Sequence, residues 1–147
     1  MTFSRTLFLL LLPGLLFPQG LDTVRKETNL TRRAQRALEY AEREMARGQK
    51  IVREFGSKTE LEAALAQVAE GAELALQSLR ETGRPPRRLS RDYKRGELKT
   101  RDLLRKLEDL EKALSLDDRP VVDAIRTKVS RVHEDFLAGV MGQSTKR

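Results

Sequence analysis

The chain has 147 residues, a formal net charge of +7 and no cysteine. The absence of cysteine excludes a disulfide framework, a thiol nucleophile, a thiolate metal site and a lipid-modified cysteine anchor. With one histidine and no tryptophan, the chain also lacks the residues of most catalytic sites, so we expect a protein that is not an enzyme.

The first 20 residues are typical of a secretory signal peptide. Arg5 gives a positive start, Thr6–Phe17 is an uncharged run of 12 residues, and Gly20 is a small residue before the polar chain. We expect cleavage after Gly20 and export to the periplasm or the extracellular space. The alternative is an uncleaved membrane anchor, although a spanning helix needs about 20 apolar residues and this run is interrupted by Pro13 and Gly14.

Residues 21–142 are expected to form one helical domain, with a flexible tail at 143–147. The first helical segment runs from Asp22 to Phe55 and carries apolar or small residues at steps of three and four. Gly56 suits the end of this helix, and Ser57-x-x-Glu60 is a capping-box pattern that opens the next one. A continuous first helix would be about 50 Å long and would extend past shorter neighbours, leaving Asp22–Thr28 unsupported.

Three further helices follow the same pattern. The second segment has a stripe from Leu61 to Leu79 and ends at Gly83, and the third follows Pro85-Pro86. The third carries leucines at 103, 107, 110 and 114, a seam that could pack in the protein's own core or receive a partner helix; we favour the core. The fourth has apolar positions from Val122 to Val140, is preceded by Asp117 or Asp118 as a cap with Pro120 in its first turn, and ends at Gly142.

Short connections between consecutive helices favour antiparallel neighbours. The sequence therefore predicts an all-α fold, an antiparallel four-helix bundle made of two helical hairpins with a long first helix. The seam of the first helix is rich in alanine, which buries little apolar area, so we expect a narrow core.

The pattern offers little support for a cofactor or a metal. A di-iron bundle needs Glu-x-x-His on two helices, whereas Ser130 stands three residues before His133. Haem held between Met45 and His133 is the one cofactor hypothesis to weigh, but the alanine-rich first helix offers few large apolar side chains for its cavity. We predict no cofactor, no metal and no catalytic residue.

The most unusual stretch is "GRPPRRLSRDYKR", Gly83 to Arg95, with six basic residues and one acid. It carries +5 of the +6 that remain without Arg5. The candidates for contact with an anionic surface are its cations, Arg84, Arg87, Arg88, Arg91, Lys94 and Arg95.

Three hypotheses compete for this stretch. Nucleic-acid binding is not expected, because only Tyr93 is available for base stacking and export removes the protein from the genome. An anionic membrane, lipid phosphate or envelope polysaccharide is a better match for an exported protein. The third hypothesis is a solvated hinge between two hairpins, in which the two prolines keep the second and third helices separate.

Taken together, the sequence predicts an exported, non-catalytic helical-bundle protein that acts by helix–helix interaction. Its partner would be a second copy or another envelope protein. The alternative is an anionic-surface binding module that uses the basic stretch.

Overall fold

The computed structural model describes residues 20–142, and the regular elements in this range are all helical. In chain order they are α1 (Leu21–Arg25), α2 (Leu30–Arg53), α3 (Lys58–Glu81), the 3₁₀ helix η1 (Pro86–Leu89), α4 (Ser90–Ala113) and α5 (Arg119–Val140). The prediction of an all-α fold is confirmed. The predicted signal peptide, apart from Gly20, and the predicted tail lie outside the described residues. Within residues 20–142, none of the helices combines the length and apolarity needed to cross a bilayer.

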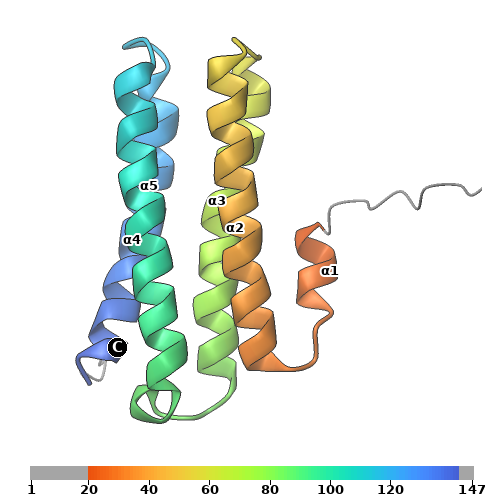
Figure 1. Cartoon of the computed structure of the whole chain (residues 1–147), viewed down its shortest axis with the longest axis vertical. Helices are drawn as coiled ribbons and strands as arrows, with labels where there is room; N and C mark the ends of the chain where they lie inside the picture. Colours follow the sequence, from red (N-terminus) through yellow and green to blue (C-terminus); the bar gives the residue numbers. More distant parts are fainter. Residues whose placement is uncertain (1–19, 143–147) are drawn as a thin grey trace, which may run out of the picture.

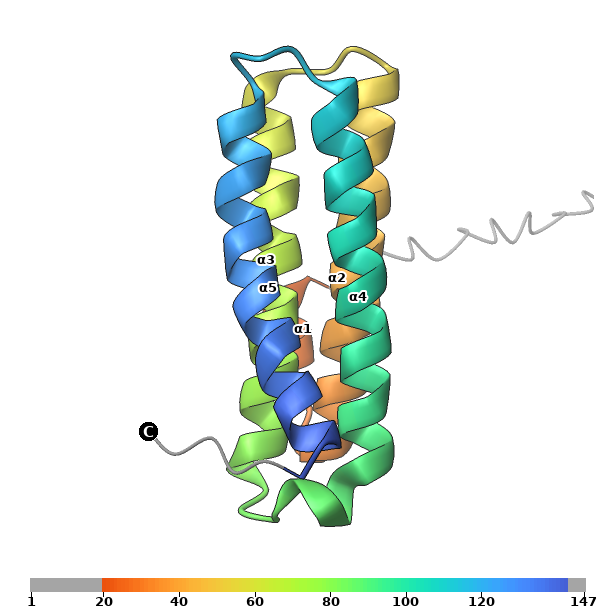
Figure 2. The same ribbon diagram turned by 90° about the vertical axis from the view of Figure 1, so that its left-hand side faces the viewer.

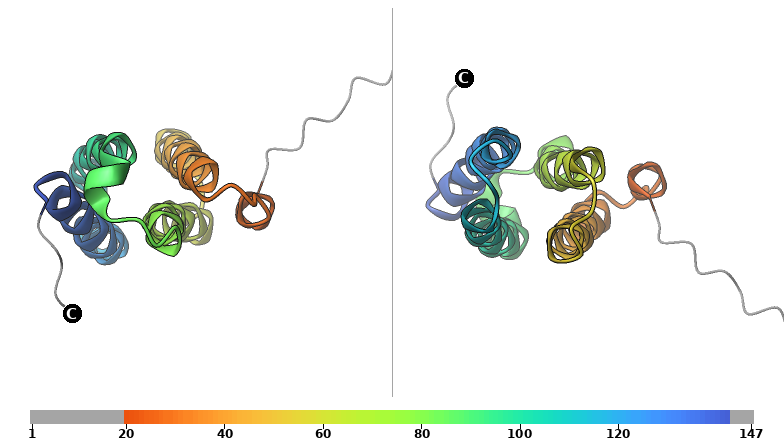
Figure 3. Two further views of the ribbon diagram at one scale, coloured as in Figure 1. Left: turned by 90° about the horizontal axis from the view of Figure 1, so that it is seen from below. Right: turned by 90° about the horizontal axis from the view of Figure 1, so that it is seen from above.

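The four long helices are arranged as two hairpins that pack side by side (Figure 1). α2 pairs with α3 and α4 with α5, and the helices of each pair run in opposite directions (Figures 1 and 2). The short helix α1 packs against α2 and α3, on the side away from α4 and α5 (Figure 3). Loops 54–57 and 114–118 therefore share one end of the bundle, and the connection 82–89 lies at the opposite end with the end of α5 (Figure 2).

The first helix differs from the prediction of one helix over Asp22–Phe55. α1 covers only five residues, and the chain turns back through residues 26–29 before α2 begins. The Asn29 side chain accepts a hydrogen bond from the backbone N–H of Arg32 at 3.0 Å, a cap that competes with helix continuation. The turn also buries Leu21 and Val24, which a straight helix would leave in water.

The predicted overhang of Asp22–Thr28 was therefore wrong. α2, α3 and α4 each contain 24 residues and α5 contains 22, so the helices of the bundle are closely matched in length. An ion pair between Arg36 and Glu27, at 2.8 Å, joins α2 to the turn that precedes it. The start of the domain is thus folded against α2 and α3 instead of being free for a partner.

The N-terminus of α3 is capped at the predicted residue. Ser57 Oγ accepts a hydrogen bond from the backbone N–H of Glu60 at 3.1 Å. We expect Ser57→Ala to lower the free energy of unfolding by about 1 kcal/mol, because one helix N–H loses its acceptor. Ser57→Gly is the matched control and should cost only a few tenths of a kcal/mol. Urea denaturation measures both, and equal losses would contradict a capping role for the side chain.

The apolar stripes meet in two buried clusters along the bundle. One cluster joins α1 to the halves of the long helices that lie nearest residues 82–89, and it includes Val24, Leu79 and Phe136. The other contains Met45 and Val129 together with leucines 103, 107 and 110 of the α4 seam, while Leu114 packs against its edge. The leucine seam of α4 therefore packs in the protein's own core, as predicted, and is not exposed to receive a partner helix.

α4 and α5 approach closely through two glycines near the end that holds residues 82–89. A Cβ on Gly96 would lie 2.3 Å from the Phe136 ring, and a Cβ on Gly139 would lie 2.1 Å from the Tyr93 ring. The two rings meet edge to face, with centroids 5.9 Å apart. Each ring thus occupies space that a glycine on the facing helix leaves open. The close approach at these two glycines was not predicted from the sequence.

Candidate functional site

Four of the six predicted basic residues are exposed at one end of the bundle without an ion pair. Arg84 precedes Pro85, Arg87 and Arg88 belong to η1, and Arg91 lies in the first turn of α4. Within residues 20–142 no carboxylate pairs with any of them. We call the surface formed by these four arginines the basic end.

The other two predicted residues, Lys94 and Arg95, are engaged in contacts within the protein. Lys94 Nζ lies 2.9 Å from the Glu97 carboxylate, and Arg95 lies 3.5 Å from Asp92 and donates to Gln35 Oε1 at 3.4 Å. Their charges are largely compensated, so they contribute less to the external field than the four arginines do.

The connection that carries these arginines has a defined geometry. α3 stops before Gly83, whose φ of 68° lies in the left-handed region that favours glycine. Thr82 Oγ1 accepts a hydrogen bond from the backbone N–H of Arg84 at 3.1 Å, and Pro86 begins η1. Leu89 is buried and ties the connection to the core. The arginine side chains therefore extend from a backbone that is fixed to the core.

A cleft of about 580 Å³ opens between this connection and the end of α5. Arg80, Arg84 and Arg87 line it together with Tyr93 and Asp135. On the α5 side the lining includes Gly139, against which the Tyr93 ring packs, and Gly142, where a Cβ would meet nothing within 4 Å. The cleft thus combines cations from three consecutive elements with one tyrosine and one carboxylate.

The cleft carries an excess of positive charge. Arg80 and Asp135 form an ion pair at 2.9 Å, which leaves Arg84 and Arg87 uncompensated. Burial raises the pKa of the Tyr93 hydroxyl; the charge of Arg80 opposes this and that of Asp135 adds to it. The hydroxyl is therefore protonated at neutral pH and is able to donate a hydrogen bond. No hydrogen bond uses this hydroxyl within the described part of the chain.

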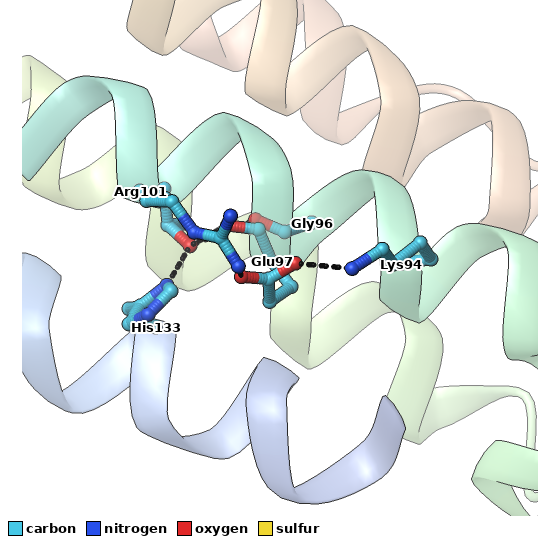
Figure 4. A network of polar contacts seen from close by, with 6 residues as sticks. Lys94, Gly96, Glu97, Arg101 and His133 are labelled. Carbon is cyan, nitrogen blue, oxygen red and sulfur yellow. Dashed lines mark hydrogen bonds and ion pairs between the residues drawn. The ribbon is translucent and has the colours of Figure 1, made fainter. Parts of the chain in front are cut away.

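A polar network lies along α4 beside the basic end (Figure 4). The Glu97 carboxylate is covered by two flanking side chains, Lys94 and Arg101, which both pair with it. One turn further, Thr100 Oγ1 lies 2.9 Å from Nδ1 of His133. The sequence analysis did not single out Glu97, although the spacing of Lys94, Glu97 and Arg101 places two cations within reach of one carboxylate.

The Glu97 network predicts a pH dependence of stability. Burial acts to raise the pKa of the Glu97 carboxyl, but hydrogen bonds and charges from Lys94 and Arg101 outweigh it and hold the pKa below its ordinary value of 4.5. Because the folded-state pKa is depressed, the stabilisation is present above about pH 4.5 and is lost as the pH falls through the lower folded-state pKa.

We expect urea denaturation of Glu97→Gln to show a smaller loss of stability between about pH 6 and pH 3 than the wild type does. Asp102 has a lowered pKa, mainly through Lys106, and remains in both proteins, so the difference between the curves reports Glu97 alone. Parallel curves would contradict the network.

The opposite end of the bundle exposes two large apolar side chains. Phe55 is 95% exposed and Leu116 is 76% exposed, one on each of the two loops there. A groove of about 390 Å³ runs between the loops, and its lining includes apolar side chains such as Ile51 and Leu61 together with the ion pair of Lys58 and Asp118. We call this end the apolar tip and define it by Phe55, Leu116 and the groove. Leu116 is a large apolar residue in a predicted loop, whereas Phe55 was predicted to end the first helix, so the exposure of its ring was not expected from the sequence.

The backbone at Phe55 corrects the expectation that Gly56 ends the helix. Phe55 has a φ of 54°, in the left-handed region, and Gly56 follows it. The N–H of Gly56 donates to the carbonyl of Ile51 at 2.8 Å, and the N–H of Phe55 donates to that of Val52 at 3.2 Å. This is the Schellman arrangement, in which glycine usually takes the left-handed position. Here Phe55 occupies the left-handed position, and the glycine follows one residue later.

A comparison with protein-family models, curated proteins and solved structures gives no match. Function is therefore inferred from the surfaces of the molecule. Two surfaces differ from an ordinary solvated helix face: the basic end with its cleft, and the apolar tip.

The residues weighed for haem have different surroundings. Met45 is fully buried in the core cluster of Leu65 and Val129, whereas His133 is half-buried and contacts Thr100. Within residues 20–142, no three side chains of the metal-ligating types form a group that could hold an ion.

Proposed function

We propose that the protein is an exported, non-catalytic helical bundle that attaches to an anionic surface through its basic end. The surface would be a membrane, a lipid phosphate layer or an envelope polysaccharide. Four exposed arginines at one end of the bundle, none of which has an ion pair within residues 20–142, carry this proposal. Each such residue contributes about 1 kcal/mol near an anionic surface, within a Debye length of roughly 8 Å.

The placement of the charge supports attachment by one end. Of the formal net charge of +7, +5 lies in residues 83–95, so the remainder of the chain is close to neutral. The basic end is the terminal surface of an elongated bundle (Figure 1). An anionic layer would therefore attract this end most strongly and leave the long helices and the apolar tip away from the layer.

Co-sedimentation tests this proposal. The chain from Leu21 to Arg147, which contains all the helices described, would be pelleted with anionic and with neutral vesicles at low salt and at about 0.15 M salt. We expect pelleting with anionic vesicles only, and partial release by salt. Pelleting with neither kind of vesicle, or equally with both, would contradict attachment through charge.

A second candidate function, self-association, is supported by the apolar tip. In residues 50–60 and 111–119, five cations are balanced by five acids. Two copies could therefore meet tip to tip without net repulsion and keep their basic ends far apart. A non-glycine residue in the left-handed region costs roughly 1–2 kcal/mol, so Phe55 sits where glycine would be more stable. Such a departure from stability is a reason to suspect a function.

We expect Phe55→Gly to raise the free energy of unfolding by about 1 kcal/mol and to abolish self-association. Sedimentation velocity over a range of concentrations measures the association, and thermal denaturation measures the stability. Leu98→Ser, which removes an exposed leucine from the side of α4, is the matched control and should leave association unchanged. A wild type that stays monomeric at all concentrations would refute this second function.

A further inference from the structure

We infer that the cleft at the basic end binds a phosphomonoester group. This inference rests on the attachment function proposed above and names the chemical group that the site selects. The cleft is bounded by the connection between α3 and α4 on one side and by the end of α5 on the other.

The charge of the cleft matches this group. Three arginines, Arg80, Arg84 and Arg87, face one carboxylate, Asp135, so the lining carries an excess of two positive charges. A phosphomonoester carries about −1.5 to −2 at neutral pH. A phosphodiester, as in most phospholipids, carries a single negative charge and would leave one arginine uncompensated.

The donors also fit a terminal phosphate. The guanidinium groups of Arg84 and Arg87 are exposed, have no ion pair in the described range, and can each bind two oxygens of one phosphate. The Tyr93 hydroxyl adds an uncharged hydrogen-bond donor. Its ring is held in place because it packs against Gly139 and Phe136. A terminal phosphate presents three free oxygens, enough for two arginines and one hydroxyl.

The shape of the cleft admits more than the phosphate alone. Pro85 and Pro86 line it beside the arginines, and on the side of α5 the lining consists of Asp135, Gly139 and Gly142. A volume of about 580 Å³ is in the range of small-molecule sites. The phosphate could therefore belong to a lipid head group or to a soluble phosphate ester. Both kinds of ligand present the same phosphomonoester group, and an experiment distinguishes them.

Vesicles that differ only in the phosphate test the selection. Phosphatidic acid carries a phosphomonoester and phosphatidylglycerol a phosphodiester, and vesicles of the two are adjusted to equal surface potential. We expect the wild type to bind the phosphatidic acid vesicles at least fivefold more tightly. Tyr93→Phe should remove most of this preference while leaving the affinity for phosphatidylglycerol vesicles unchanged. Equal binding of both vesicles by the wild type would overturn the inference.

Two further variants keep the test decisive. Tyr40→Phe removes the other tyrosine hydroxyl, which donates to Gln67 on the α2–α3 hairpin, and should keep the preference. Asp135→Asn removes the carboxylate from the cleft and should raise the affinity for phosphatidic acid vesicles about fivefold, more than for phosphatidylglycerol vesicles. A loss of preference in Tyr40→Phe, or no gain in Asp135→Asn, would contradict recognition inside the cleft.

Glycerol 3-phosphate separates the two sources. If it binds the wild type in a calorimetric titration and displaces the protein from phosphatidic acid vesicles, the cleft takes soluble esters as well as lipid. If it does neither while the vesicle preference holds, the ligand is a lipid phosphomonoester. Failure to pellet with any anionic vesicle would contradict the attachment function. Salt-sensitive pelleting without a preference for phosphatidic acid would contradict only this inference.

Discussion

Reversing the charge of Arg84, Arg87, Arg88 and Arg91 to glutamate is expected to abolish binding to anionic vesicles and to leave the helices intact. The four side chains are exposed and unpaired in the described range, so their replacement breaks no contact of the fold. At about 1 kcal/mol for each cation near the surface, neutralising all four would lower the affinity roughly a thousandfold, and reversal adds repulsion. Co-sedimentation measures the binding and circular dichroism the helix content.

A matched variant separates position from net charge. Replacing Lys50, Arg53, Lys112 and Lys128 by glutamate changes the net charge of the protein by the same amount, and these four residues are exposed away from the basic end. We expect this variant to keep most of its binding at about 0.15 M salt, because charges beyond a Debye length are screened. Equal losses in both variants would show that net charge, and not the basic end, controls attachment.

Placing leucine at Gly96 is expected to cause a large loss of stability. A Cβ alone would lie 2.3 Å from the Phe136 ring, and the ring is fully buried and has nowhere to move without opening the contact between α4 and α5. Overpacking of this kind costs about 1–3 kcal/mol and sometimes more. We expect a fall in Tm of roughly 10 °C, measured by thermal denaturation.

Two controls test this packing. Gly48→Ala introduces a Cβ whose nearest neighbour is the flexible end of Leu65 at 3.3 Å, so we expect a change of less than about 1 kcal/mol. Combining Gly96→Leu with Phe136→Ala enlarges the side chain on one side of the contact and shortens the side chain on the other. The loss in the double variant should be smaller than the sum of the two single losses by about 1 kcal/mol or more. Additive losses would mean that the two positions do not share one space.

The basic end shows how far sequence reasoning could reach into the candidate site. All six cations were found from their clustering in the local sequence, and the pairing of Lys94 and Arg95 could also have been read from carboxylates three residues away. Arg80 and Asp135 could not be found in this way. They are 55 residues apart and meet only because α3 packs against α5.

The sequence by itself determined the number of the long helices, the Ser57 cap and the position of the basic stretch. These features depend on apolar spacing, capping and charge within a few residues, which the local sequence contains in full. Tertiary structure alone decided that Leu21 and Val24 fold back, that Gly96 and Gly139 receive aromatic rings, and that a cleft opens beside Tyr93. Each of these depends on the distance between surfaces that are remote in the chain, and that distance is set by the packing of whole helices.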